Sequence, residues 1–328
     1  MKIRFSLLSL AMVSLPSMAN LASAPGFSGE VSASIGFSQI SSNLYTGGDK
    51  SISSPYQRAG DKNNAFLFPL GNAAYTFSGL DKQVYFGVSR DDLAVGDLAI
   101  ELGYRQALSD GMVLDLSILP TLVNKDVWAD PYATKVNRSK TEESGNAFRL
   151  KLTNVNGTNF SLDTAFAVKD VENEKSGQAQ ELGLSEQQRD LLSRDSSSFY
   201  LKGSYQLQLD KTSSLRPSVT LTKINADGDA FSSSGLGAEI SYFKVLNEHR
   251  FALTAKYTNR DYDETNPLYG IKRENSEAGV FFAYEKIDFM DWNDWSLVAL
   301  AGFNNNDSNI DFYDVQESLM SVGMNYRF

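Results

Sequence analysis

The sequence predicts an all-β protein, a single transmembrane antiparallel up-and-down β-barrel of about fourteen strands. Three observations predict this fold. Apolar and polar residues alternate along many separate stretches, as in strands whose two faces meet different environments. The connections alternate between short turns and mostly long polar loops, as the two rims of an outer-membrane barrel do. The chain also begins with a secretory signal and ends on an aromatic residue within a strand.

The bulk composition restricts the alternatives. A chain of 328 residues would form about two soluble domains or one closed sheet. Cysteine is absent, which excludes disulfides and thiolate metal sites. The mean hydropathy is -0.29 and no run of about 18 apolar residues occurs, so the pattern excludes a spanning helix but not spanning strands. The net charge of -10 argues against nucleic acid as a partner.

The N-terminal residues have the three parts of a secretory signal. Lys2 and Arg4 form the charged start, residues 5–15 form a short apolar core, and residues 17–19 form a small-x-small cleavage pattern. We predict cleavage after Ala19, with residues 22–24 as the second choice of cleavage pattern. The competing interpretation is a buried N-terminal helix.

These boundaries divide the chain into a signal peptide, residues 1–19, and a single outer-membrane β-barrel domain, residues 20–328. No cysteine follows the cleavage site, so a lipoprotein anchor is not expected. Few residues separate the cleavage site from the first strand. A plug domain is therefore not expected, which argues against a siderophore transporter and, for lack of an N-terminal hatch, against a fatty acid transporter.

The fourteen predicted strands share period-2 alternation of apolar and polar residues. In chain order they are residues 27–40, 65–78, 83–89, 98–108, 112–118, 148–152, 160–169, 199–209, 215–221, 236–243, 251–258, 280–284, 295–303 and 318–328.

Turn-forming residues separate the strands at one rim, with Asn156-Gly157 as the strongest hairpin signal. The connections predicted for the other rim are mostly long and polar. They are residues 41–64, 91–96, 124–146, 170–197, 227–229, 259–275 and 304–311. An even strand number places both termini at the rim with the short turns, which we assign to the periplasm.

A soluble β-sandwich is the alternative fold, because its strands also alternate. A sandwich gives no reason for one-sided loop lengths. The apolar faces of the predicted strands are also almost free of charge, since Lys223 and Lys244 fall at strand ends where they could reach the membrane interface. Both features favour the barrel.

The last strand has Met320, Val322, Met324, Tyr326 and Phe328 on its apolar face. A strand that continues to the final atom is unusual, because chain termini tend to fray. Met324, Tyr326 and Phe328 resemble the assembly signal of Gram-negative outer-membrane barrels. The resemblance implies recognition by the barrel assembly machinery through this strand.

The mature sequence as a whole resembles an outer-membrane family of gammaproteobacteria, of the Vibrio and Shewanella type, that is known only as a domain of unknown function. Its size is similar to that of monomeric fourteen-stranded porins, a likeness of architecture alone. The resemblance implies a barrel in the cell outer membrane, in contact with lipid and lipopolysaccharide, and implies no activity.

Charged residues on the polar strand faces would point into the barrel. A fourteen-stranded barrel falls between small filled barrels and large water-filled ones, so these charges would set the field in a wet lumen. We predict a porin-like channel for the passive diffusion of small hydrophilic solutes. The predicted pore-lining residues are Glu101, Arg105, Arg149, Lys151, Lys202, Arg216, Glu239 and Lys256. The alternative is a plugged barrel with a structural or surface-binding role, such as an adhesin or phage receptor.

An enzyme is the third class. General-base or nucleophilic catalysis commonly involves histidine. The single histidine, His249, falls on a predicted periplasmic turn, away from any outer serine. Acidic residues at 261–264 and 227–229 lack a catalytic or calcium-loop pattern. We therefore expect no enzyme activity, no catalytic residue, no cofactor and no metal.

The loop of residues 170–197 contains a helix signal, with Ser185 as N-cap and Gln188 three residues later. Leu191 and Leu192 follow and need a dry surface, which the lumen or a neighbouring loop could supply. This loop is a candidate constriction or lid, and deletion of residues 177–194 is predicted to raise conductance. The alternative is a solvated or disordered surface helix.

Overall fold

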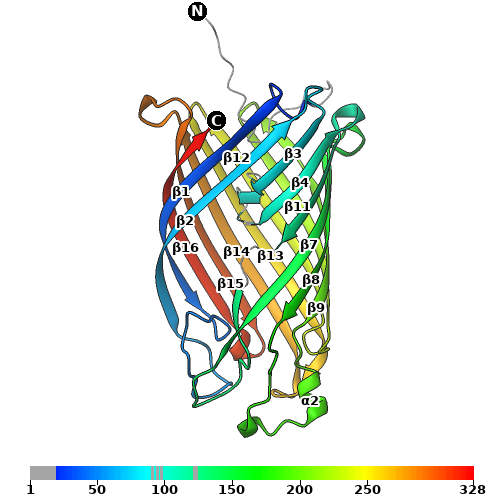
Figure 1. Cartoon of the computed structure of the whole chain (residues 1–328), viewed down its shortest axis with the longest axis vertical. Coiled ribbons are helices and arrows are strands. Elements are labelled where there is room, and N and C mark those ends of the chain that lie inside the picture. Colours follow the sequence, from blue (N-terminus) through cyan, green and yellow to red (C-terminus); the bar gives the residue numbers. More distant parts are fainter. Residues whose placement is uncertain (1–19, 90–91, 94–95, 97–98, 121–124) are drawn as a thin grey trace, which may run out of the picture.

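The computed structural model describes residues 20–89, 92–93, 96, 99–120 and 125–328, so the predicted signal peptide lies outside the described residues. The strands form one tilted barrel wall (Figure 1). They are β1 (Gly26–Ser41), β2 (Asp61–Thr76), β3 (Lys82–Val88), β4 (Ile100–Ala107), β5 (Val113–Pro120), β6 (Lys125–Trp128), β7 (Lys140–Thr153), β8 (Phe160–Val171), β9 (Ser196–Tyr205), β10 (Leu207–Asp210), β11 (Ser213–Ala226), β12 (Ser233–Leu246), β13 (His249–Asn266), β14 (Ile271–Ile287), β15 (Trp295–Ser308) and β16 (Val315–Arg327). Short helices in the connections are η1 (Ser109–Gly111), η2 (Val155–Gly157), η3 (Gln180–Leu182), α2 (Glu186–Asp190), η4 (Phe289–Asp291) and η5 (Asp311–Tyr313).

The wall is a closed antiparallel barrel of fourteen strands. β1 pairs with β2 on one side and with β16 on the other, which closes the sheet. β5 and β6 pair with successive parts of β7, and β9 and β10 both pair with β11, so each of these couples occupies one place in the wall. The predicted fold class is confirmed, and a two-sheet sandwich is excluded.

The two faces of the wall are inverted relative to a soluble protein. On β1, Ile35 and Phe37 are 65% and 73% exposed, whereas the preceding Ser34 and the polar Asn325 of the neighbouring β16 are buried. The same alternation follows from period-2 geometry on the neighbouring strands. An apolar exterior around a polar interior is the arrangement expected where lipid replaces water outside the barrel.

The two rims differ as the sequence predicts. Both termini and the short turns lie at one rim, and the longer connections and α2 lie at the other, which we call the outer rim (Figure 1). Two predicted loops are wrong in extent. Residues 124–146 contain β6 and the start of β7. The connection predicted at residues 259–275 spans only the four residues 267–270. Strand pairing continues past the apolar band, where both faces are polar and alternation disappears.

The outer connections pack on one another and form a small core that we call the loop cap. Its buried residues are Tyr132, Leu192, Ala230, Ile310, Phe312 and Tyr313. The Tyr132 and Tyr313 hydroxyls lie 2.5 Å apart, although the β6–β7 and β15–β16 connections that carry them leave the wall on opposite sides. The cap therefore extends across the outer mouth.

The predicted helix signal in the longest loop is confirmed. Ser185 and Gln188 form a capping box at the start of α2. Leu191 packs against the loop cap and Leu192 is fully buried in it. The dry surface for the two leucines therefore comes from neighbouring loops at the outer rim, and the lid role stays a prediction.

Candidate functional site

Cross-strand register places five inward charges of alternating sign side by side on one part of the wall. Arg105 lies opposite Asp115, Asp115 opposite Lys151, Lys151 opposite Asp163, and Asp163 opposite Lys202. We call this row the charged belt. Opposite charges in directly facing positions stabilise a sheet, and Arg105 Nε donates to Asp115 at 2.7 Å. The belt runs from β4 to β9.

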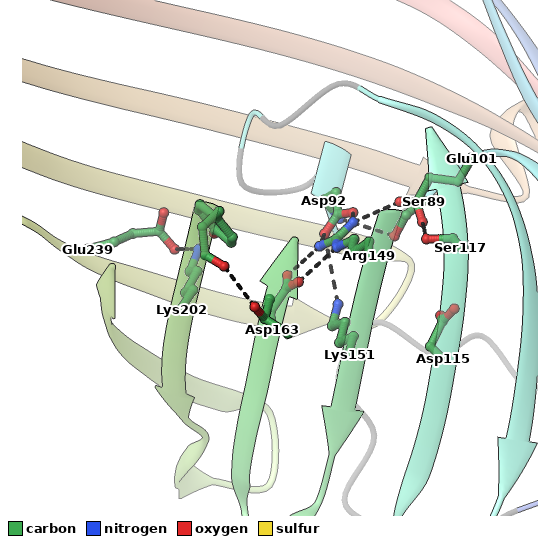
Figure 2. Close-up of polar contacts among 12 residues, drawn as sticks. Ser89, Asp92, Glu101, Asp115, Ser117, Arg149, Lys151, Asp163, Lys202 and Glu239 are labelled. Carbon is green, nitrogen blue, oxygen red and sulfur yellow. Dashed lines mark hydrogen bonds and ion pairs between the residues drawn. The ribbon is translucent and has the colours of Figure 1, made fainter. Parts of the chain in front are cut away.

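Arg149 lies on β7 two residues before Lys151, on the same face, and holds three carboxylates together (Figure 2). Its guanidinium donates to Asp163 at 2.5 and 2.9 Å, to Asp92 at 2.7 Å and to Glu101 at 2.8 Å. Glu101 also accepts a hydrogen bond from Ser117 at 2.7 Å. Charge-assisted bonds of this kind are stronger than neutral ones, so Arg149 fixes these side chains in one arrangement.

Asp92 belongs to the connection between β3 and β4, which we call the crossing segment (residues 89–99, described at 89, 92, 93, 96 and 99). Asp92 contacts Arg149 on β7. Gly96 has a φ of +87°, and a Cβ atom there would lie 2.7 Å from the ring of Phe281 on β14. β7 and β14 are the sixth and twelfth of the fourteen strands, so they face each other across the barrel. The described residues of this segment therefore cross the lumen.

The wall opposite the charged belt carries inward apolar side chains, which we call the apolar strip. It consists of Phe66, Phe68 and Leu70 on β2, Phe281 on β14, Leu300 on β15 and Leu319 on β16. Register places Phe68 opposite the inward Ser34, and Leu319 opposite Gly302. Glycines make room for the rings, since a Cβ on Gly36 would lie 2.7 Å from Phe66.

A cavity of about 70 Å³ lies where the crossing segment meets the apolar strip. Leu70, Leu93 and Leu300 line its apolar side, and its polar side is lined by Asn72, Asn325 and the charged residues Glu30, Arg250 and Glu285. The cavity is large enough for water molecules with polar partners.

A second ion cluster joins the first and last strands near the rim at which both termini lie. Arg327 of β16 contacts Glu30 of β1 at 3.6 Å and also bonds Glu285 of β14. Glu285 lies 3.6 Å from Arg250 and accepts a hydrogen bond from Ser296 at 2.8 Å. These charges surround the seam at which the barrel closes.

The loop cap is reinforced by two buried arginines. Arg138 donates to the carbonyls of Asn43 at 2.8 Å and Pro131 at 3.0 Å, and burial lowers its pKa to about 10. Arg194 bonds Glu174 at 2.6 Å. Burial alone would raise the pKa of Glu174, but hydrogen bonding and charge from Arg194 outweigh it and lower that pKa.

The eight predicted pore-lining residues all lie on the inward face of the wall, and their role in a pore stays a prediction. Glu101 and Arg149 form the carboxylate network, and Arg105, Lys151 and Lys202 belong to the charged belt. Lys202 also bonds Glu239 at 2.8 Å. Arg216 stacks over Phe243 at 4.8 Å, and Lys256 lies opposite Glu239 in the register.

The predicted assembly residues Met324, Tyr326 and Phe328 face outward on the last strand. Tyr326 packs between the rings of Trp295 and Phe328 at 5.1 and 6.5 Å. Phe328 exchanges two backbone hydrogen bonds of 3.0 Å with Gly29 of β1. The final residue therefore takes part in closing the barrel.

His249 is the first residue of β13, next to the predicted periplasmic turn, with its ring on the outer face of the wall. Its Nδ1 lies 2.8 Å from the Tyr284 hydroxyl. Within the described ranges, no cluster of three or more His, Asp or Glu side chains is placed to hold a metal ion. No helix among the described residues is long and apolar enough to cross a membrane.

Sequence reasoning missed two parts of the lumen. The crossing segment was expected to be an ordinary short loop at residues 91–96. Strand length gave no signal, because residues 98–108 are predicted as a strand of spanning length, whereas the observed β4 has only eight residues. The apolar strip on β2 was missed because residues 65–70 are apolar on both faces, so alternation does not identify the inner one.

Comparison with known proteins identifies a family but no activity. No curated protein matches the chain. OmpT of Vibrio cholerae has a TM-score of 0.45 and 9% identity, covering 92% of this chain and 97% of that one. OprD of Pseudomonas aeruginosa has a TM-score of 0.41 and 10% identity, covering 95% and 97%. OccAB4 of Acinetobacter baumannii has a TM-score of 0.36 and 10% identity, covering 92% and 98%.

These similarities to solved structures are distant, and the fold rests on the strand register alone. The bacterial group suggested by the sequence stays a prediction. The family model for DUF2860, described as a protein of unknown function, matches residues 26–327, which is nearly the whole barrel. The chain therefore belongs to the DUF2860 family.

Proposed function

We propose that this protein is an outer-membrane channel for the passive diffusion of small hydrophilic solutes. The observation that carries the proposal is the exposure of inward charges. The side chains of Arg105, Lys151 and Glu277 are 31%, 25% and 34% exposed although all three point into the barrel. Space inside the barrel therefore reaches these charges, and charged groups of this exposure need water.

The crossing segment is the proposed constriction. Asp92 lies within ion-pair distance of Arg149 and Lys151, at 2.7 and 3.8 Å, so it narrows the lumen beside the charged belt. The apolar strip forms the opposite side. A solute at this level would pass between charges of both signs and an apolar surface, which favours small polar molecules over large ones.

The remaining parts of the proposal concern the surroundings of the barrel. The exposed apolar exterior would contact membrane lipid and, at the outer rim, lipopolysaccharide. The barrel assembly machinery would recognise the last strand through Met324, Tyr326 and Phe328. We propose no catalytic role, since the one histidine lies on the lipid-facing side of β13.

The test is single-channel conductance of the refolded mature protein in a planar bilayer. We expect stable ohmic steps. Lys151→Gln should shift ion selectivity towards cations, and the matched Glu277→Gln should shift it towards anions, because each removes one partly exposed inward charge. Conductance steps with the same ion selectivity in the wild type and in both variants would contradict conduction through this lumen.

A plugged barrel with a surface-binding role is the second candidate. The loop cap favours it, because the Tyr132–Tyr313 contact extends across the outer mouth. A wild-type barrel that inserts but stays silent would support this candidate. Conductance that appears only after deletion of residues 177–194 would identify the cap as the barrier.

A further inference from the structure

The ladder of hydrogen bonds around the wall is interrupted on the outer half of the barrel. β2 pairs with β3 only at residues 72–76. In the described part of the chain, residues 61–71 of β2 pair with β1 and have no partner strand on their other side. β3 ends at Val88 and β4 begins at Ile100, next to the last pair between β2 and β3.

The far side of this interruption is the edge of β5 and β6. β4 pairs with β5 as far as Ile118, and the following residues Leu119 and Pro120 pair only with β7. Among the described residues, β6 likewise pairs only with β7. The two edges are separated by the places of β3 and β4, which is about three strand spacings or roughly 14 Å. Figure 1 shows the strands of the opposite wall behind this region.

The β1–β2 connection closes the interruption at the outer rim. Ile52 forms a β-bridge with Thr134, and the Thr46 hydroxyl donates to the carbonyl of Asp126 at 3.3 Å. Described residues therefore border the interruption along both strand edges and at the outer rim, whereas residues 90–91, 94–95, 97–98 and 121–124 lie outside the described part of the chain. β2, β5–β6, the ends of β3 and β4, and the β1–β2 connection form this border, and we call the bordered region the lateral opening.

The lateral opening lies at membrane level. Leu67 of β2 is 70% exposed on the outer face, beside Ile35 of the lipid-facing side of β1. A bare strand edge is not tolerated against lipid unless it lines a cavity or meets another molecule. Both edges carry a proline, Pro69 and Pro120, which has no N–H to leave unpaired and is typical of edge strands.

The route inward from this opening is apolar. Phe66, Phe68 and Leu70 lie on the unpaired stretch of β2 and point into the barrel. Leu70 also lines the 70 Å³ cavity, together with Leu93 and Leu300. The inner side of the opening is therefore apolar along β2, and the cavity that Leu70 reaches has a mixed lining, because Glu30, Arg250 and Glu285 also contribute to it.

We propose that the lateral opening admits an apolar or amphipathic small molecule, with a hydrocarbon or aromatic body, that moves between the outer leaflet and the lumen. Its body would lie along Phe66, Phe68 and Leu70 at the inner side of the opening. This route is separate from the proposed path of hydrophilic solutes along the barrel axis.

The first experiment measures lipid access. Because the chain has no cysteine, a fluorophore can be attached to one introduced cysteine and quenched by brominated lipid, which acts on contact. A label at Phe68→Cys should be quenched nearly as well as one at Ile35→Cys on the outer face. The control Thr220→Cys, inward on β11 and paired on both sides, should stay unquenched. A label at Phe68→Cys that behaves like Thr220→Cys would overturn the proposal.

The second experiment measures entry of N-phenyl-1-naphthylamine, a lipid-soluble aromatic dye, into intact cells that carry the protein in their outer membrane. Leu70→Glu should slow entry about threefold or more, because an apolar molecule would pass a buried carboxylate. Thr220→Glu adds the same charge to the continuous wall and should leave entry unchanged. Equal entry with Leu70→Glu and wild type would contradict the proposal.

Two controls separate this proposal from the channel function. The folded state of each variant is checked by its heat-modifiable mobility in gels. Ohmic conductance with unchanged dye entry would leave the hydrophilic path standing and remove the lateral one. Dye entry through a barrel without conductance would support the lateral route and remove the hydrophilic one.

Discussion

The barrel wall has a continuous part and an interrupted part. From β11 through β16 to β1, every strand pairs along most of its length, and inward and outward residues alternate regularly. From β2 to β7, two strands are short, one connection crosses the lumen, and ion pairs converge on Arg149. Backbone hydrogen bonds hold the first part together. The second part depends more on particular side chains, so single substitutions should affect it more strongly.

The largest difference in the free energy of unfolding is expected between substitutions of Arg149 and of Lys202. Arg149→Gln leaves Asp92, Glu101 and Asp163 without their shared cation, and we expect it to lower the free energy of unfolding by about 3–5 kcal/mol. Lys202→Gln removes one close ion pair, with Glu239, and should cost less than half as much. Urea titration of folding in lipid vesicles measures both variants. Equal losses would show that the interrupted wall does not depend on this network.

A smaller effect is expected in the loop cap. Leu192 is fully buried, so Leu192→Ala should destabilise the cap by about 2–4 kcal/mol. Leu184→Ala, at a partly buried position against the same core, is the matched control and should cost less. The rate of protease cleavage within residues 172–195 reports opening of the cap. Similar cleavage rates in both variants would argue against a cooperative cap.

The smallest effect concerns pH. The lowered pKa of Glu174 means that its contribution to stability is present above its unfolded pKa, about 4.3. This contribution is lost as pH falls through the lower folded value. Acidification from pH 6 to 3 should therefore speed cleavage of the cap. Glu174→Gln should flatten this dependence, and an unchanged pH profile in that variant would assign it to other groups.

The predictability of each region follows from its physics. On β1 and β16 each strand meets lipid on one face and polar groups on the other, so alternation alone predicts strand, face and closing role. On β2, Phe66 and Leu67 are both apolar, and the pattern does not tell inside from outside. The role of Asp92 depends on Arg149, which lies 57 residues away and is brought near by the fold.

The loop cap could not be predicted for a related reason. Tyr132 and Tyr313 are 181 residues apart and meet because their connections lean over the same mouth. Residues 185–192 show the opposite case. The capping box is a local pattern, so the sequence predicts α2, while the partners of Leu192 come from other loops.

The seam between β1 and β16 makes closure of the barrel depend on the last strand of the chain. Twelve residue pairs join residues 30–41 of β1 to residues 316–327 of β16. Until those last residues emerge, β1 has one edge without a partner, and an unpaired edge is poorly tolerated in lipid. A chain cut short by a dozen residues lacks the strand that closes the wall. Closure of the wall therefore depends on the segment of the barrel that is synthesised last.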